Sequence, residues 1–279
     1  MDKIFDFAQT GALLKVDFVI AAIVAAAVLG LLAGVLGPLI VSRNMVFAVH
    51  GTSELALTGG AAALLLGWDI GGGALAGSIV AALVLGLLSR KNSDYDSVIG
   101  VVLSFGLGVG VLMLWLYRGR ASNKFGLLTG QIVGQDFASI ALLVGCVVGV
   151  FAVLAVIYRP LLFASVDPEV ARARGVPTKA LALVFAVMVG VATALSVRTI
   201  GSLLVLALMV TPAAAACRVT ASPLRVTLLA VLFAEVSAIG GIILSLAPGA
   251  PVSAFVTTIS FLIYVVCWLI SRSRRLTRA

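Results

Sequence analysis

Residues Phe18–Val41 read FVIAAIVAAAVLGLLAGVLGPLIV, a run of 24 residues without a charged side chain. A transmembrane helix needs about 20 mostly apolar residues to cross the hydrocarbon core of a bilayer. The run is therefore long enough to span a membrane. The residues before it, Met1–Asp17, hold three aspartates against two lysines, so they lack the basic start of a signal peptide. We expect them to form an N-terminal interfacial segment.

Eight further apolar runs follow along the chain, most of them separated by short polar loops. No run alternates polar and apolar residues as the strands of a membrane barrel do, so all nine are expected to be helices. The predicted spans are Phe18–Val41, Val46–Trp68, Gly71–Ser89, Val98–Tyr117, Phe137–Tyr158, Ala180–Val197, Ile200–Cys217, Leu224–Leu246 and Val252–Ser271. The sequence predicts an all-α, polytopic membrane helix bundle of nine spans, or of eight if Gly51, Gly59 and Gly60 break the second.

The composition indicates the same class. Of the 279 residues, 62% are apolar and 11% are charged, and the mean hydropathy is +1.23, whereas a soluble domain is about 25% charged. The net charge of +8 does not indicate a nucleic-acid partner, because the basic residues lie in loops between apolar runs and form no continuous patch. Cys146, Cys217 and Cys267 lie within apolar runs and are expected to act as small apolar side chains.

The distribution of lysine and arginine predicts the orientation in the membrane. With nine spans, one side receives 13 of these residues and the other receives 6. The richer side is expected to be cytoplasmic, so the C-terminus lies inside and the N-terminus outside. The cytoplasmic residues are Arg43, Arg90, Lys91, Arg159, Arg172, Arg174, Lys179, Arg218, Arg225, Arg272, Arg274, Arg275 and Arg278.

No repeat and no polar linker divides the chain. Residues 1–279 are therefore expected to form a single membrane domain, with an interfacial segment at 1–17, a long cytoplasmic loop at 159–179 and a basic cytoplasmic tail at 272–279.

The only histidine, His50, lies within MVFAVHGTSELALTGG (Met45–Gly60), and Glu54 follows one helical turn later. Residues four apart share one face of a helix, with Cβ atoms about 5–6 Å apart, so this imidazole and carboxylate can bracket one ion. Ionisable groups at membrane depth are costly and usually face a transport path. We interpret the pair as a metal-transit or gating site. An internal hydrogen bond between the two is the alternative.

The loop at 159–179 carries strong signals for a short helix. Asp167 is a good N-cap, Pro168 suits the first helical position, and Glu169 favours the positive end of the helix dipole. Gly175 suits the C-terminal cap, and Pro177 stops further helix. These signals predict a capped surface helix at about 168–174, a rigid part that another protein can grip.

Two further positions carry polar or helix-breaking signals inside apolar runs. Pro212 removes a helix hydrogen bond in the seventh run, and the hydroxyl of Thr211 can satisfy a freed group, so a kink is expected there. Glu235 lies in the middle of the eighth run. A carboxylate at that depth is expected to face the bundle interior, as a structural hydrogen-bonding group or as a second polar site.

Several of these features together resemble the membrane subunits of the ABC metal importers, the permease family for zinc, manganese and iron uptake. The most specific matches are DPE and ARGVP within Asp167–Pro177, and IGSLL and TPA within Ile200–Ala213. The earlier family motif, Gly-Asp-x-x-Ser-His, falls on Val49–Glu54. Here His50 stands where the family has its aspartate, and Glu54 stands where it has its histidine.

The resemblance implies a homodimer of permeases in the bacterial cytoplasmic membrane, working with a dimer of cytoplasmic ATP-binding cassette ATPases and an extracytoplasmic metal-binding protein. It assigns ion passage or gating to His50 and Glu54, with Zn²⁺ or Mn²⁺ as the transported ion and no permanently bound cofactor. It makes residues 159–179 the loop that couples to the ATPase, with Asp167, Pro168, Glu169, Arg172, Arg174 and Gly175 as its coupling residues. No GxxxxGK[ST] motif occurs in the sequence, so the chain is expected to be a transport subunit and not an enzyme.

Two other transport functions remain open from the sequence. A permease for an iron chelate or cobalamin would need a wider path and no ion ligands. A proton-coupled secondary transporter could use His50, Glu54 and Glu235 as a relay, although the two halves of the chain show no matched pair of broken helices. An intramembrane enzyme is disfavoured, because a single histidine excludes the HExxH motif.

Overall fold

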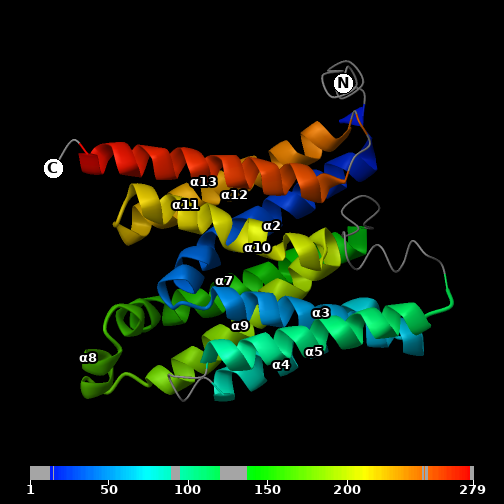
Figure 1. The fold of residues 1–279 in the computed structure, drawn as a ribbon, viewed down its shortest axis with the longest axis horizontal. Coiled ribbons are helices and arrows are strands. Elements are labelled where there is room, and N and C mark those ends of the chain that lie inside the picture. Colours follow the sequence, from blue (N-terminus) through cyan, green and yellow to red (C-terminus); the bar gives the residue numbers. More distant parts are fainter. Residues whose placement is uncertain are drawn as a thin grey trace. The chain divides into compact units, whose positions relative to one another are not determined.

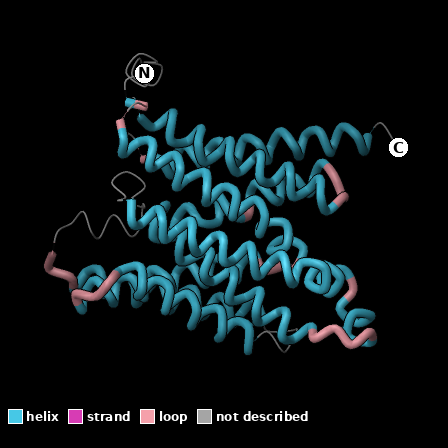
Figure 2. The backbone as a smooth tube through the Cα atoms, turned by 180° about the vertical axis from the view of Figure 1, so that it is seen from behind, coloured by secondary structure: helices cyan, strands magenta, loops and turns pink. Residues whose placement is uncertain are grey.

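The computed structural model describes residues 13–14, 16–88, 95–119, 137–246, 248 and 251–276. Within these residues every regular element is a helix, and no strand is drawn (Figure 1, Figure 2). The prediction of an all-α fold is therefore confirmed. The helices are α2 Asp17–Ser42, α3 Val46–Leu66, α4 Ile70–Leu88, α5 Tyr95–Leu116, α7 Phe137–Val166, α8 Pro168–Ala173, α9 Thr178–Ile200, the 3₁₀ helix η2 Ser202–Leu204, α10 Val205–Met209, α11 Thr211–Val219, α12 Pro223–Leu246 and α13 Val252–Leu276.

Six of these helices are long and apolar enough to cross a membrane by length and composition, namely α2, α7, α9, α12 and the described parts of α5 and α13. Two shorter apolar helical stretches, Ile70–Leu85 and Val205–Val219, fall on two more of the predicted spans. Helix α3 belongs to neither group, because the polar residues around His50 and Glu54 lower its hydropathy. The chain is thus a multi-pass membrane protein, and its count of eight or nine spans stays a prediction.

The chain folds into two compact units. Unit 1 comprises Met1–Val41, Ile132–Val144 and Leu206–Ala279, and unit 2 comprises Ser42–Gln131 and Gly145–Val205. Each unit draws on segments that are distant in sequence. The assignment of residues 1–279 to a single membrane domain stays a prediction, and most of the interfacial segment 1–17 lies outside the described residues.

Helix α3 is the centre of unit 2, where it packs against α4, α5 and α9 (Figure 1). Glycines make the closest of these approaches possible, because a Cβ added to Gly59 would collide with the backbone oxygen of Gly73, and one added to Gly77 with the backbone oxygen of Leu55. Pairs of small residues allow such close helix packing in membranes. These close glycine contacts therefore fix α4 against the helix that carries His50 and Glu54.

Replacement of Gly59 by valine is expected to break the α3–α4 contact. Overpacking a tight interface costs about 1–3 kcal/mol, and more where the collision is with backbone that cannot move aside. We expect a lower melting temperature in detergent and a smaller folded peak in gel filtration. Gly108→Val is the matched control, since a Cβ at Gly108 meets nothing within 4 Å. Equal behaviour of the two variants would contradict this packing.

Unit 1 is built by similar approaches along α2. Gly34 lies against the backbone of Val231 on α12, and a Cβ added to Gly37 would lie 2.6 Å from the backbone oxygen of Met209 on α10. Helix α11 packs on α12 through a small-residue cluster, and α13 is tied to α10 by a hydrogen bond from Ser260 Oγ to the backbone oxygen of Ala207, 2.9 Å long. The residues of that small cluster are Ala213, Ala216, Val226 and Ala230.

Two of the predicted spans differ clearly from the structure. Helix α7 continues past Tyr158 and through Pro160 to Val166, so the first part of the predicted loop 159–179 is helical. Burial explains the extension, because Leu161 is 0% and Ala164 is 4% exposed, and their packing outweighs the one hydrogen bond that Pro160 removes. The seventh run is not one helix, since it breaks at Gly201, which has a φ of +83°, and again at Val210.

Candidate ion-transit site and docking helix

His50 and Glu54 lie on consecutive turns of α3, early in the helix. At 1.5 Å per residue, Glu54 is about 12 Å from the start of a helix about 31 Å long. The His50 side chain is 38% exposed, whereas that of Glu54 is 6% exposed. The carboxylate is therefore enclosed by the helices of unit 2, and the imidazole stands at its open side.

The two side chains face each other without a hydrogen bond. The distance from His50 Nδ1 to Glu54 Oε1 is 4.0 Å, which is beyond hydrogen-bond range. Among the described residues, the buried side-chain atoms without a hydrogen-bond partner are His50 Nδ1, Glu54 Oε2 and Ser202 Oγ. A buried polar atom left unpaired costs about 1–3 kcal/mol. An arrangement that leaves a nitrogen and an oxygen unpaired one helical turn apart suits a ligand that reaches both.

A seam of buried hydroxyl groups continues from this pair between α3, α9 and η2. Ser53 Oγ donates to the backbone oxygen of Ser202 at 3.1 Å, and Thr52 Oγ1 lies 3.4 Å from Thr193 Oγ1. On the other side of α3, Thr58 Oγ1 lies 2.6 Å from the backbone oxygen of Gly106 on α5. The seam fixes the rotation of α3 about its axis, and so the direction in which His50 and Glu54 point.

Of these seam residues, Thr52 and Ser53 lie within the family motif at Val49–Glu54, and only Ser53 fills a specified position of it. Thr193 carries a signal in the sequence, because Thr193, Ser196 and Thr199 recur at every third residue of an apolar helix, and all three are buried. A polar stripe at this spacing on a membrane helix indicates a face turned to other helices. Ser202 gives no such signal, because its place depends on the turn at Gly201.

Helix α5 packs closely against the backbone and Cβ of Glu54. A Cβ added to Gly106 would lie 3.3 Å from the Cβ of Glu54, so α5 approaches the stem of the carboxylate closely. One turn later, a Cβ added to Gly110 would lie 3.1 Å from Thr58 Oγ1. These two glycines hold α5 against the face of α3 that carries Glu54.

The chemistry available in one chain is an imidazole nitrogen and a carboxylate oxygen. Among the described residues, no three His, Cys, Asp or Glu side chains are grouped so that they could hold a metal ion together. A closed structural zinc site has four protein ligands. Two ligands from one chain therefore suit a site that releases its ion, or a site that a second copy of the chain completes.

The predicted surface helix is α8, at Pro168–Ala173. The Asp167 side chain accepts hydrogen bonds from the backbone N–H groups of Glu169 and Val170, at 3.2 and 3.0 Å. At the other end, Arg174 is the C-cap, so the helix is one residue shorter than the predicted 168–174. Gly175 follows with a φ of +78°. The bonds from Gly175 N to Arg172 O and from Val176 N to Ala171 O complete a Schellman cap.

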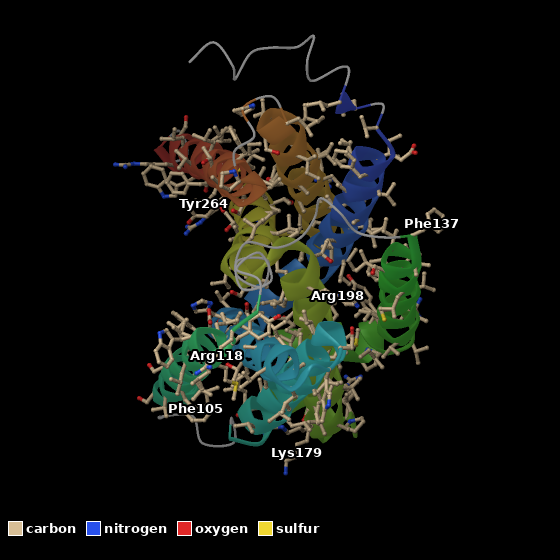
Figure 3. The ribbon with its side chains drawn as sticks, turned by 90° about the vertical axis from the view of Figure 1, so that its right-hand side faces the viewer. Phe105, Arg118, Phe137, Lys179, Arg198 and Tyr264 are labelled. Atoms are coloured by element: carbon tan, nitrogen blue, oxygen red, sulfur yellow. The ribbon has the colours of Figure 1, made fainter. Side chains whose placement is uncertain are left out.

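Helix α8 is exposed on most of its surface and is fixed by few contacts. Ala171 is its only buried residue, and the Arg172 guanidinium donates to Thr178 Oγ1 at 3.2 Å. Val166, just before the helix, is 78% exposed, and Val170, within it, is 43% exposed. Lys179, in the first turn of α9, points away from the helices (Figure 3). A short rigid helix with exposed apolar residues is suited to dock in the groove of another protein.

The remaining predicted positions lie in unit 1. Helix α11 begins at Thr211, with Pro212 in its first turn, directly after the interruption at Val210. Glu235, on α12, lies against Gly30 of α2, where an added Cβ would be 3.0 Å from Glu235 Oε1. Gly30 thus leaves room for this carboxylate, and a functional role for Glu235, Thr211 and Pro212 stays a prediction.

Comparison with known proteins gives a consistent result. The sequence profile of the ABC 3 transport family matches residues 15–271. The chain is 26% identical over 262 residues to the manganese transport system membrane protein MntC of Halalkalibacterium halodurans, with 93% of this chain and 89% of that protein covered. It is 26% identical over 219 residues to the high-affinity zinc uptake system membrane protein ZnuB of Haemophilus influenzae, with 78% and 84% covered.

A solved structure shares the fold. The structure of PsaBC from Streptococcus pneumoniae in complex with Fab superposes with a TM-score of 0.86, covering 97% of this chain and 99% of that one at 22% identity.

Proposed function

We propose that this chain, which belongs to the ABC 3 transport family, is the membrane permease of an ATP-driven importer of manganese or zinc ions. The family match covers most of the chain, and the relatives named above are membrane proteins of manganese and zinc transport systems. The six long apolar helices fit a multi-pass protein of the bacterial cytoplasmic membrane.

The observation that carries the cargo assignment is the geometry of His50 and Glu54. A buried carboxylate and a half-buried imidazole face each other at 4.0 Å, and each has a buried atom without a hydrogen-bond partner. A mixed nitrogen and oxygen donor set suits Zn²⁺ or Mn²⁺ better than Mg²⁺, which prefers oxygen ligands and keeps several waters. A pathway site must also bind weakly enough to release its ion.

The working assembly would contain two permeases, a dimer of cytoplasmic ATPases and an extracytoplasmic metal-binding protein. Two copies of α3 would bring up to four ligands, from two His50 and two Glu54 side chains, to one pathway. The exposed helix α8 would dock on the ATPase, and ATP binding there would move α8 and open the path to one side at a time. Hydrolysis belongs to the partner chain, since no Walker A motif occurs in this sequence.

Transport in proteoliposomes that contain the permease and its ATPase, supplied with the extracytoplasmic metal-binding protein, tests this function. Uptake of radioactive manganese or zinc is expected to require ATP and all three proteins, and each free ion is expected to compete with the other. Uptake by the permease alone under a proton gradient would overturn the proposal in favour of a secondary transporter. Uptake of an iron chelate or cobalamin that neither free ion inhibits would overturn the cargo assignment.

Cysteine labelling tests the orientation on which this arrangement depends. In a variant without the three native cysteines, we expect Ala173→Cys on α8 to react with an impermeant reagent only from the cytoplasmic side. Asp69→Cys, in the turn between α3 and α4, is expected to react only from outside. Both residues are exposed, so a lack of labelling would not come from burial. Reaction of both from the same side would contradict the nine-span arrangement.

A further inference from the structure

Arg43 lies in the turn between α2 and α3, three residues before α3 begins. Its guanidinium Nη1 donates a hydrogen bond to Ser165 Oγ at 2.9 Å. The same hydroxyl donates to the backbone oxygen of Leu161 at 2.7 Å, so Ser165 presents a lone pair to Arg43. The guanidinium carbon also lies 5.6 Å from the centre of the Phe185 ring. Arg43 therefore holds two segments that are more than 120 residues away in sequence.

Both partners of Arg43 belong to the segments that carry α8. Ser165 lies at the end of α7, two residues before the N-cap Asp167, and Phe185 lies two turns into α9, the helix that follows α8. Within unit 2, α8 thus lies between α7 and α9, and one side chain from each of these two helices contacts the Arg43 guanidinium. Any displacement of α8 that moves these helices must either carry Arg43 along or break its contacts.

Burial makes Arg43 depend more on its partners than an exposed arginine does. The guanidinium is half-buried, and this burial lowers the pKa of Arg43 below its ordinary value. A desolvated cation is held mainly by the partners it has, here one charge-assisted hydrogen bond and one aromatic face. Lysine replaces these contacts only in part, because its ammonium lacks the planar guanidinium that donates to one partner while it lies over a ring.

Arg43 also lies directly before α3, the helix that carries His50 and Glu54. Helix α3 starts at Val46, and His50 lies four residues later, about 6 Å along the axis. Because a helix moves as a rigid rod over such a length, a shift at its first turn reaches His50 and Glu54. We propose that Arg43 is the positioning residue that transmits movement of the docking helix α8 to the α3 helix bearing His50 and Glu54.

This inference rests on the proposed function, and its own test is the ratio of metal ions transported to ATP molecules hydrolysed. In proteoliposomes with the ATPase and the metal-binding protein, Arg43→Ala is expected to leave complex assembly and ATP hydrolysis near wild type, while this ratio falls by about 10-fold, within the range known for coupling residues. Arg43→Lys should recover part of the ratio. A merely structural role would lower hydrolysis, assembly and uptake together.

Further variants test the contact between Arg43 and Ser165 on its own. Ser165→Ala removes only the acceptor hydroxyl and is expected to lower the ratio in the same direction, and it replaces Arg43→Ala if that variant does not fold. In the double variant the second change should add little, because both remove one contact. Arg225→Ala, at an exposed arginine early in α12, is the control and should keep the wild-type ratio.

The outcomes separate this inference from the proposed function. If the wild-type complex shows no ATP-dependent metal uptake, the proposed function fails. If the wild type transports and both Arg43→Ala and Ser165→Ala keep its ratio of ions to ATP, the assignment of Arg43 is wrong while the function stands. A ratio lowered equally by Arg225→Ala would also overturn the assignment.

Discussion

Replacement of His50 by alanine, or of Glu54 by glutamine, is expected to abolish metal uptake while the protein still assembles in the membrane. Loss of an outer-shell partner of a metal ligand already costs about 10–100-fold in affinity or activity, so loss of a ligand itself should cost at least about that much. Glu54→Gln keeps the size of the buried side chain and removes its charge. Uptake of radioactive manganese and zinc, normalised to permease in the membrane, measures the effect.

An exchange of the two groups supplies the control. His50→Asp combined with Glu54→His places a carboxylate and an imidazole in the order of the family motif, again four residues apart on one face of α3. We expect this double variant to retain uptake well above either single variant, because the donor set is preserved. Single variants that transport at the wild-type rate would show that these side chains do not handle the ion.

Replacement of Val170 by aspartate is expected to uncouple the permease from its ATPase. Val170 is the exposed large apolar residue of α8, and truncation or charging of such an anchor in a docking groove costs about 2–4 kcal/mol, or a factor of about 30–1000 in affinity. Co-purification of the ATPase with tagged permease, together with ATP-dependent uptake, should both be lost. Folding of the permease should not change, because the residue is 43% exposed.

The cap of α8 provides the matched control for that experiment. Asp167→Asn removes a charge next to Val170 but keeps an equally good N-cap, so docking should persist, whereas Asp167→Ala loses about 1 kcal/mol of helix stability and should weaken docking moderately. Loss of the ATPase from Asp167→Asn but not from Val170→Asp would contradict apolar docking of α8.

Local physics made much of this structure predictable. The apolar runs became helices because an unpaired backbone is too costly in lipid. Helix α8 was expected almost to the residue, since Asp167, Pro168 and Gly175 act on their own neighbours and need no distant contact. The pair formed by His50 and Glu54 was visible for the same reason, because helical spacing alone sets its geometry.

Long-range contacts made the rest unpredictable. The extension of α7 through Pro160 depends on the burial of Leu161. The contact between Arg43 and Ser165 joins residues 122 positions apart, and no sequence pattern in either segment predicts it. The break at Gly201 brings the backbone of Ser202 to Ser53, and the sequence indicated a kink only further on, at Pro212. Tertiary packing decides each of these features.

X-ray absorption spectroscopy of the purified permease complex loaded with manganese or zinc tests the central claim most directly. We expect a mixed shell of nitrogen and oxygen donors with the scattering pattern of imidazole, which His50→Ala removes and Glu54→Gln alters. A bound ion whose shell is the same in the wild type and in both variants would contradict the claim that His50 and Glu54 pass the ion through the membrane.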